Sequence, residues 1–261
     1  MKADGYTAVQ SWSDAEAVLA AGLRASGMGR VMQPHEPDAI ARAHKALGLD
    51  ATTLHVGDSF ETDAQIDTLV GAVLEASARH AYPLYIETHR ATITQDLRRT
   101  LDMVERWPDV RFNADLSHWY TGHELTYGGE FLNRVERLQP VFDRVRFMHG
   151  RIGNAGAIQT ALSDPGPYVD HHRLMWQKCF EGFLAGAQPG DYLSFNPELL
   201  PMSIGGGAQT MWIHYAQPRS DLRDDEFGGE PSDRYADAHR LWEIACECFT
   251  MAQQQMNGDT P

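Results

Sequence analysis

Short apolar segments alternate with amphipathic segments along most of this chain of 261 residues. The apolar segments are typical of buried strands, and the amphipathic segments have the period of helices. Since parallel strands need crossovers between them, this alternation predicts a parallel α/β fold, which we expect to be a single domain. The expected strands are residues 5–10, 29–33, 52–57 and 83–86, followed by the strands that lead into Asp115, His149 and Glu198.

Residues 63–80 form the clearest predicted helix, because apolar side chains recur there at helical spacing on one buried stripe. Two capping boxes, Ser13–Glu16 and Thr92–Gln95, predict the starts of helices that end near Ala25 and before Pro108. Residues 120–129 and 153–167 read as loops. Further helices are expected at 37–47, 131–139, 171–183 and 231–251, the last with Tyr235, Ala238, Leu241, Trp242, Ala245 and Phe249 on its buried side.

Four of the apolar segments lead into an acid or an imidazole. Glu87 follows the segment 83–86, Asp115 follows Phe112, His149 follows Met148, and Glu198 follows the segment 193–197. In a ring of parallel strands, the carboxyl ends of all strands meet at one mouth, where barrel enzymes place their chemistry. Three carboxylates and one imidazole suit a divalent cation such as Mn²⁺, Mg²⁺, Co²⁺ or Zn²⁺.

Each of these residues also has an ordinary structural interpretation. Glu87 could pair with Arg90, Asp115 could cap the turn after its strand, and His149 could be a hydrogen-bonded core residue. Glu198 follows Pro197, so its local context supports a site residue least of the four. The metal-site hypothesis therefore depends on the residues occurring together, since a bound ion needs at least three of the four.

The net charge and the cysteine content indicate which partners the protein binds and in which cellular compartment it resides. The formal net charge is −14, and a strongly acidic surface disfavours nucleic acid as a partner. No apolar run approaches the roughly 20 residues of a membrane span, and no signal peptide is visible. The three cysteines, Cys179, Cys246 and Cys248, give no disulfide framework, so we expect a reduced, cytoplasmic protein.

The motifs at the strand ends resemble those of the xylose-isomerase-like TIM barrels, which include sugar isomerases, sugar epimerases and the endonuclease IV group. The matches are Glu87 with His89 (Glu-x-His), Asp115 with His118 (Asp-x-x-His), His149 with Arg151 (His-x-Arg), and Glu198. The resemblance covers residues 5–198. It implies a (β/α)8 barrel in which Glu87, Asp115, His149 and Glu198 hold a divalent metal ion, with Mn²⁺ expected first.

The strand count departs from this family. Four strands should precede the strand of Glu87, and we count three, so residues 5–10 correspond to the second strand of the family. The chain therefore lacks the first strand and helix, or else residues 211–215 supply an eighth strand. The ligand order favours the first alternative. A missing strand leaves an unpaired edge, which favours association into a homo-oligomer.

The same resemblance implies substrate-binding roles near the mouth. The resemblance implies that His118 contacts substrate. We expect Arg151 to do the same, because the planar guanidinium of an arginine holds hydroxyl, carboxylate or phosphate groups. His55 and His89 end strands and are expected to face the mouth, and Trp119 could form an apolar wall against a sugar ring or lie in the core. We treat His35, His123, His171 and His172 as surface residues.

These residues favour a metal-dependent isomerase or epimerase that acts on a sugar, a sugar acid or a polyol-derived ketone. Glu87 and Glu198 would remove and return a proton through a metal-stabilised enediolate, while Asp115 and His149 mainly hold the ion. Two alternatives remain: a metal-dependent hydrolase or lyase of the endonuclease IV type, and a catalytically inactive sugar-binding barrel.

Overall fold

The main sheet contains seven strands that follow one another in chain order. The computed structural model describes residues 2–11, 14–201, 203–204, 211–212 and 232–258. The registers of the first five strands, from β1 to β5, are parallel throughout. The strands are β1 (Ala8–Ser11), β2 (Arg24–Val31), β3 (Thr52–Val56), β4 (Leu84–Glu87), β5 (Phe112–Ala114), β6 (Val145–His149) and β7 (Ser194–Asn196).

This topology confirms the predicted fold class, a (β/α)8-type barrel fold that lacks one strand. Three strands precede β4, as counted from the sequence. The alternative, an eighth barrel strand at residues 211–215, is wrong for its described part. There β9 (Met211–Trp212) pairs antiparallel with β8 (Ser203–Ile204) in a separate two-stranded sheet, and residues 213–215 lie outside the described residues.

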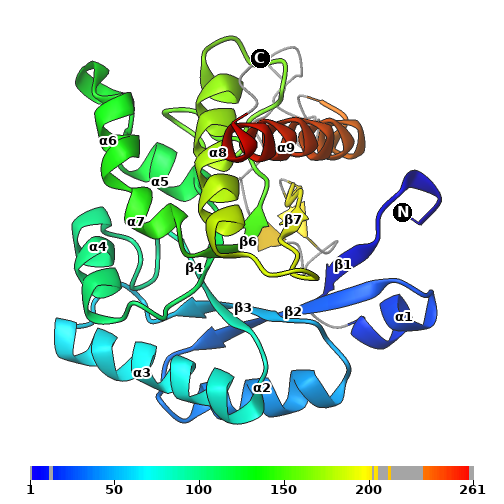
Figure 1. The fold of residues 1–261 in the computed structure, drawn as a ribbon, viewed down its shortest axis with the longest axis vertical. Helices are drawn as coiled ribbons and strands as arrows, with labels where there is room; N and C mark the ends of the chain where they lie inside the picture. Colours follow the sequence, from blue (N-terminus) through cyan, green and yellow to red (C-terminus); the bar gives the residue numbers. More distant parts are fainter. Residues whose placement is uncertain (1, 12–13, 202, 205–210, 213–231, 259–261) are drawn as a thin grey trace. The chain divides into compact units, whose positions relative to one another are not determined.

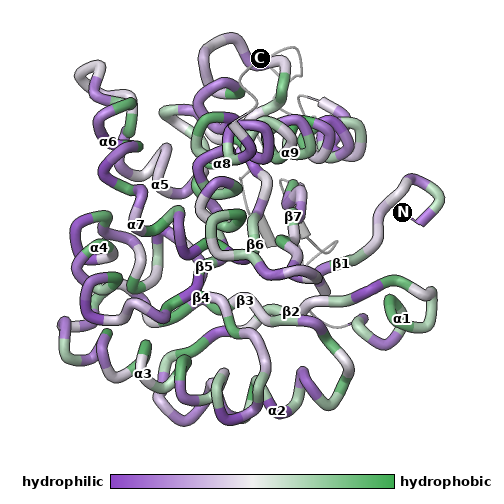
Figure 2. Tube along the Cα trace, viewed as in Figure 1, coloured by the Kyte–Doolittle hydropathy of each residue, from purple (hydrophilic) through white to green (hydrophobic). Residues whose placement is uncertain are grey.

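The chain divides into two compact units. Unit 1 comprises residues 1–114 and 144–147, and unit 2 comprises residues 115–143 and 148–261. Hydrophilic and hydrophobic stretches alternate along the helices of both units (Figure 2). Among the described residues, no helix has the length and apolar character needed to cross a membrane.

Helices pack against the strands of unit 1, and their apolar stripes form its core together with the strands. A short 3-10 helix, η1 (Lys2–Asp4), opens the chain, and α1 (Ala15–Ala20), α2 (Glu36–Ala46), α3 (Asp63–His80) and α4 (Leu97–Arg106) follow. Helices α2 and α3 pack side by side along β2 and β3 (Figure 1). The bounds predicted for α3 are confirmed, because Thr62 and Gln65 form a capping box at its start.

Two helix predictions in unit 1 are wrong. The helix expected to reach Ala25 ends at Ala20, and β2 already begins at Arg24. The Thr92–Gln95 segment is not a capping box, because the Thr92 hydroxyl donates to the His89 carbonyl and the N-cap of α4 is Asp96. The Asp96 side chain accepts from the Arg99 N–H at 2.8 Å. The polar residues at 92–95 therefore stabilise a turn after the strand, although their spacing is that of a capping box at the start of a helix.

Unit 2 is mainly helical. Its long helices α8 (Tyr168–Gly186) and α9 (Arg234–Asn257) pack against each other, with the Phe180 and Phe249 rings edge to face at 5.4 Å (Figure 1). The loop predicted at 153–167 has no helix or strand, whereas part of the loop expected at 120–129 is helical. The shorter elements are α5 (Ser117–Gly122), η2 (Tyr127–Gly129), α6 (Phe131–Arg137) and α7 (Gln139–Phe142).

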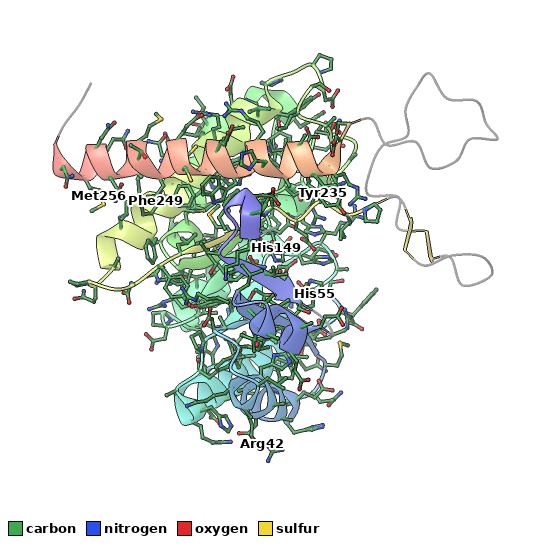
Figure 3. The ribbon with its side chains drawn as sticks, turned by 90° about the vertical axis from the view of Figure 1, so that its right-hand side faces the viewer. Arg42, His55, His149, Tyr235, Phe249 and Met256 are labelled. Atoms are coloured by element: carbon green, nitrogen blue, oxygen red, sulfur yellow. The ribbon has the colours of Figure 1, made fainter. Side chains whose placement is uncertain are left out.

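The buried side of α9 differs from the predicted one. Tyr235 is 80% exposed and Trp242 is 41% exposed, although both were expected in the core. Figure 3 shows α9 extending from Tyr235 to Met256. Leu241 and Ala245 are buried as predicted, but the large apolar side chains of Tyr235 and Trp242 drew the expected stripe too far to one side of the helix. The buried residues are Leu241, Ile244, Ala245, Cys248 and Ala252.

His172 on α8 is buried, which corrects its prediction as a surface residue. Its Nδ1 donates to the Tyr168 carbonyl oxygen at 2.9 Å, and its Nε2 accepts from the Gly153 N–H at 3.4 Å. These two bonds suit only a neutral ring with one protonated nitrogen. Burial lowers the pKa of His172 to about 4, against a smaller opposing effect of the Tyr168 carbonyl.

We expect His172 to make the free energy of unfolding depend on pH between about 4 and 6.5. In that range the unfolded chain binds a proton that the folded chain excludes, so the folded state loses stability as the pH falls. From pH 7 to pH 5 this histidine should account for a loss of about 2 kcal/mol. Urea unfolding at both values, with His172→Gln as the comparison, measures it. Gln keeps one donor and one acceptor but does not titrate, so an equal loss in both proteins would contradict the assignment.

Candidate metal centre

Glu87 is a buried carboxylate at the end of β4 in unit 1, and strand register explains its surroundings. Its partner across the ladder is Asn113 of β5, whose side-chain amide donates to Glu87 Oε2 at 2.9 Å. His55 Nε2, from the neighbouring strand β3, lies 3.1 Å from Glu87 Oε1. Glu87 is 2% exposed, and a buried carboxylate is stable only with such partners.

His89 completes a group of possible ligands in unit 1. The rings of His55 and His89 lie with centroids 4.4 Å apart. His89 Nδ1 accepts from the Ala91 N–H at 3.2 Å, which fixes the orientation of the ring. One ligand atom each from His55, Glu87 and His89 lies within 4.8 Å of the other two. Arg42 of α2 is exposed on the opposite side of unit 1 from His55 (Figure 3).

Asp115 is the centre of a second buried group, which belongs to unit 2. Its Oδ1 accepts from the Ser117 hydroxyl at 2.6 Å and from the Ser117 N–H at 3.2 Å. Its Oδ2 accepts from the Arg151 guanidinium. Asp115 therefore caps the turn into α5, as one interpretation of the sequence held, and it also forms a buried ion pair.

The buried Arg151 side chain contacts several members of this group. Its Nε donates to the Ser117 hydroxyl at 3.1 Å, and its Nη2 donates to His118 Nε2 at 3.1 Å. The same nitrogen lies 3.7 Å from Glu198 Oε2. Since an arginine only donates, His118 Nε2 acts as an acceptor in this arrangement. The guanidinium balances the negative charge of Asp115 and Glu198 where water is excluded.

His149 and Glu198 form the other half of the unit 2 group. His149 is the last residue of β6, and its Nδ1 lies 3.0 Å from Glu198 Oε2. Asp115 and His149 are fully buried, whereas the Glu198 side chain is 18% exposed. One ligand atom each from Asp115, His149 and Glu198 lies within 4.8 Å of the other two. One imidazole nitrogen and two carboxylate oxygens are a donor set that fits Mn²⁺, Co²⁺ or Zn²⁺.

Gly150 fixes the approach of β7 to the end of β6. Its N–H donates to the Asn196 carbonyl at 2.8 Å, and a Cβ at this position would lie 2.0 Å from Cζ of Phe195. The Phe195 ring in turn packs edge to face against the buried Trp176 at 5.1 Å. The absence of a side chain at Gly150 therefore lets β7 lie close to β6, and this places Glu198 near His149.

Gly150→Ala is expected to destabilise the protein by about 1–3 kcal/mol, the usual effect of overpacking a filled site. The added methyl group must displace the Phe195 ring, which Trp176 restrains from behind. Denaturant unfolding measures the loss. In a Phe195→Leu background the same change should be much less harmful, because the smaller side chain leaves room. An equal loss in both backgrounds would show that Phe195 is not the obstacle.

Within each unit, the predicted site residues lie together. His55, Glu87 and His89 are together in unit 1, and the larger group of unit 2 contains Asp115, His118, His149, Arg151 and Glu198. Trp119 is 1% exposed, in keeping with the core alternative considered for it. Whether these residues bind metal or substrate stays a prediction.

Two residues that hold the acids were not found from the sequence. Asn113 holds Glu87, and Ser117 bonds both Asp115 and Arg151. The spacing Asp-x-Ser was a usable signal for Ser117, because an aspartate commonly accepts from the residue two positions later. For Asn113 the signal was weaker, since its role follows from the register between β4 and β5.

Comparisons with known proteins support the fold. No family model and no curated protein matches the chain, whereas seven solved chains do. A xylose isomerase domain protein from Planctomyces limnophilus matches at a TM-score of 0.51 and 14% identity, over 97% of this chain and 90% of that one. The fold therefore resembles the xylose-isomerase-like barrels, as the motifs predicted.

Two further solved structures are less similar. The probable 3-DHS dehydratase AsbF of Bacillus anthracis, involved in petrobactin synthesis, matches at a TM-score of 0.44 and 14% identity, over 58% of this chain. This chain spans 65% of the length of that dehydratase. A dihydrodipicolinate synthase from Agrobacterium tumefaciens matches at a TM-score of 0.34 and 14% identity, over 74% of this chain and 59% of that one.

Proposed function

We propose that this protein is a divalent-metal-dependent isomerase or epimerase that acts on a sugar, a sugar acid or a polyol-derived ketone. The observation that carries the proposal is the buried group of Asp115, His149 and Glu198, whose ligand atoms lie within 4.8 Å of one another. The similarity to a xylose isomerase domain protein supports the choice of a small sugar-like substrate. The ion, Mn²⁺ first among the candidates, would polarise a carbonyl oxygen and a neighbouring hydroxyl of the substrate.

The different exposure of the three residues supports different roles. Asp115 and His149 are fully buried, so they would hold the ion and take no part in proton exchange with solvent. Glu198 is 18% exposed, so it could reach a substrate to accept or return a proton, and it would also be a ligand of the ion. Arg151, which lies 3.7 Å from Glu198, holds a substrate hydroxyl or carboxylate beside it.

Glu87 is proposed as the fourth ligand and as the second proton-transfer group. Its inclusion rests on the sequence pattern, in which Glu87 is the first of the four acid or imidazole residues that end apolar segments. Within unit 1, Asn113 and His55 hold both of its oxygens in one orientation, as an acid or base requires. His55, His89 and His118 complete the proposed substrate-binding residues, whereas the buried Trp119 belongs to the core.

One experiment tests this function directly. Metal-free protein is titrated with Mn²⁺, and ketoses and keto-inositols are then screened in heavy water for exchange of a substrate proton with solvent. We expect about one ion per chain and exchange that requires the ion. Protein that binds no divalent ion would contradict the proposal and favour an inactive sugar-binding barrel.

The histidine pair of unit 1 favours a second candidate function. His55, Glu87 and His89 form a nitrogen-rich group of the kind that zinc prefers. Several zinc ions per chain would indicate a metal-dependent hydrolase or lyase of the endonuclease IV type. The formal charge of −14 speaks against a nucleic-acid substrate. Metal analysis of the purified protein therefore separates the two functions, because one ion per chain indicates the isomerase and several zinc ions indicate the hydrolase or lyase.

A further inference from the structure

Glu198 stands in a segment that has no regular secondary structure. Strand β7 ends at Asn196, and residues 197–201 after it form neither helix nor strand. The backbone hydrogen bonds of β7 therefore stop two residues before Glu198, so they bring the segment near His149 without holding Glu198 itself. Pro197 and Pro201 restrict the backbone on either side of it, but a restricted dihedral angle does not by itself place a side chain to within the tolerance of a metal site.

The side-chain amide of Gln159 forms hydrogen bonds with both backbone groups of Leu200, a residue of this segment. Its Nε2 donates to the Leu200 carbonyl oxygen at 2.7 Å, and its Oε1 accepts from the Leu200 N–H at 2.9 Å. The amide thus pairs with Leu200 as a neighbouring strand would. Gln159 is 4% exposed, so both bonds are shielded from water.

The loop that carries Gln159 is itself fixed by hydrogen bonds. The Thr160 N–H donates to the Ile152 carbonyl at 2.9 Å. The Asp164 carboxylate accepts from the Thr160 hydroxyl at 2.7 Å and from the Asn154 amide at 2.8 Å. This loop begins directly after His149 and Arg151, so Gln159 connects the residues that end β6 with the segment of Glu198.

We propose that Gln159 is a positioning residue that sets the place of Glu198 relative to His149. The inference rests on the proposed function for the role of Glu198 as a ligand, and on the two Leu200 hydrogen bonds for its geometry. Gln159 touches neither substrate nor ion in this assignment. It acts through the backbone, in the way that the partners of metal ligands fix their orientation.

The first measurement does not depend on the metal. Amide hydrogen exchange at Leu200 is compared between wild-type protein and Gln159→Ala, and we expect several-fold faster exchange in the variant. Gln159→Glu serves as a second variant that keeps the side-chain size. It retains an acceptor for the Leu200 N–H and loses the donor for the carbonyl. Equal exchange in wild-type and Gln159→Ala protein would overturn the proposal.

The second measurement is the affinity of metal-free protein for Mn²⁺. Gln159→Ala is expected to weaken it by about ten- to a hundredfold, the usual effect of removing a group that orients a ligand. In a Glu198→Gln background the same change should alter the affinity by less than about twofold, because two changes that act through one ligand are not additive. An equal loss in both backgrounds would overturn the positioning role.

A matched control separates positioning from general destabilisation. Gln177 on α8, in the same unit, donates its amide to Glu181 of the same helix at 3.1 Å and not to the segment of Glu198. Gln177→Ala should leave both readouts unchanged, and a loss as large as that of Gln159→Ala would overturn the proposal. If wild-type protein binds no Mn²⁺ while Leu200 exchange still responds to Gln159→Ala, the proposed function fails and Gln159 is a structural clamp only.

Discussion

Replacing Glu198 with Gln is expected to slow turnover by about a hundredfold or more, the usual contribution of general acid–base catalysis. Gln keeps the shape of the side chain and one oxygen donor, but it cannot accept a proton as a base. The variant should retain a good share of the bound metal, because Asp115 and His149 stay in place. Turnover with metal-loaded protein and metal content after dialysis are the two measurements.

Comparison with Glu87→Gln shows whether two carboxylates share the proton transfer. In a two-base mechanism, each variant should lose exchange of a substrate proton with heavy water from its own face, which proton NMR resolves at each carbon. Glu136→Gln on the exposed side of α6 is the matched control and should behave as wild type. Near-normal exchange and turnover in both site variants would rule out the proton-transfer mechanism.

Replacing Arg151 with Met is expected to destabilise the metal-free protein by about 3–5 kcal/mol, as when one member of a buried ion pair is removed. Asp115 is fully buried, and without the guanidinium its charge has lost its cationic partner. Denaturant unfolding in the presence of a chelator measures the effect. Arg151→Lys keeps a positive charge and should lose less. If Arg151→Met is as stable as the wild-type protein, the ion pair between Arg151 and Asp115 contributes little to the free energy of unfolding.

Arg151→Met also shows whether Arg151 acts on the bound metal ion or on the substrate. We expect divalent ions to restore much of the lost stability, because a ligand that binds only the folded state stabilises it. Arg151→Met should also keep its metal and bind substrate more weakly, since an arginine cannot become a metal ligand. Loss of metal in this variant would contradict the assignment of Arg151 to substrate.

The sequence predicted the strand ends well because buried parallel strands are almost wholly apolar there. A charged residue such as Glu87 is easily recognised at the end of such an apolar run. The order of the strands could also be predicted, because neighbouring strands of this sheet follow one another in the chain. The start of β2 was missed for the opposite reason. Arg24, Ser26 and Gly27 give no apolar run, and the strand forms there because β1 and β3 pair with it on both sides.

The supporting residues of the site could not be predicted in the same way. Gln159 meets Leu200 across 41 residues of chain, and nothing in the local sequence distinguishes it from a surface glutamine. His172 looked like a surface histidine on a helix, yet the backbone of Gly153 and Tyr168 satisfies its ring in the core. Such roles depend on tertiary contacts, which hydrophobic period and residue spacing do not encode.

The contact between Gly150 and Phe195 has an evolutionary consequence. The middle position of a His-x-Arg motif is nominally free, yet here a methyl group at Gly150 would meet the ring of Phe195 at 2.0 Å. Substitutions at the two positions should therefore be coupled among descendants of this sequence. A lineage that acquires Ala at position 150 is expected to carry a smaller residue at position 195, so the pair should covary although 45 positions separate it in the chain.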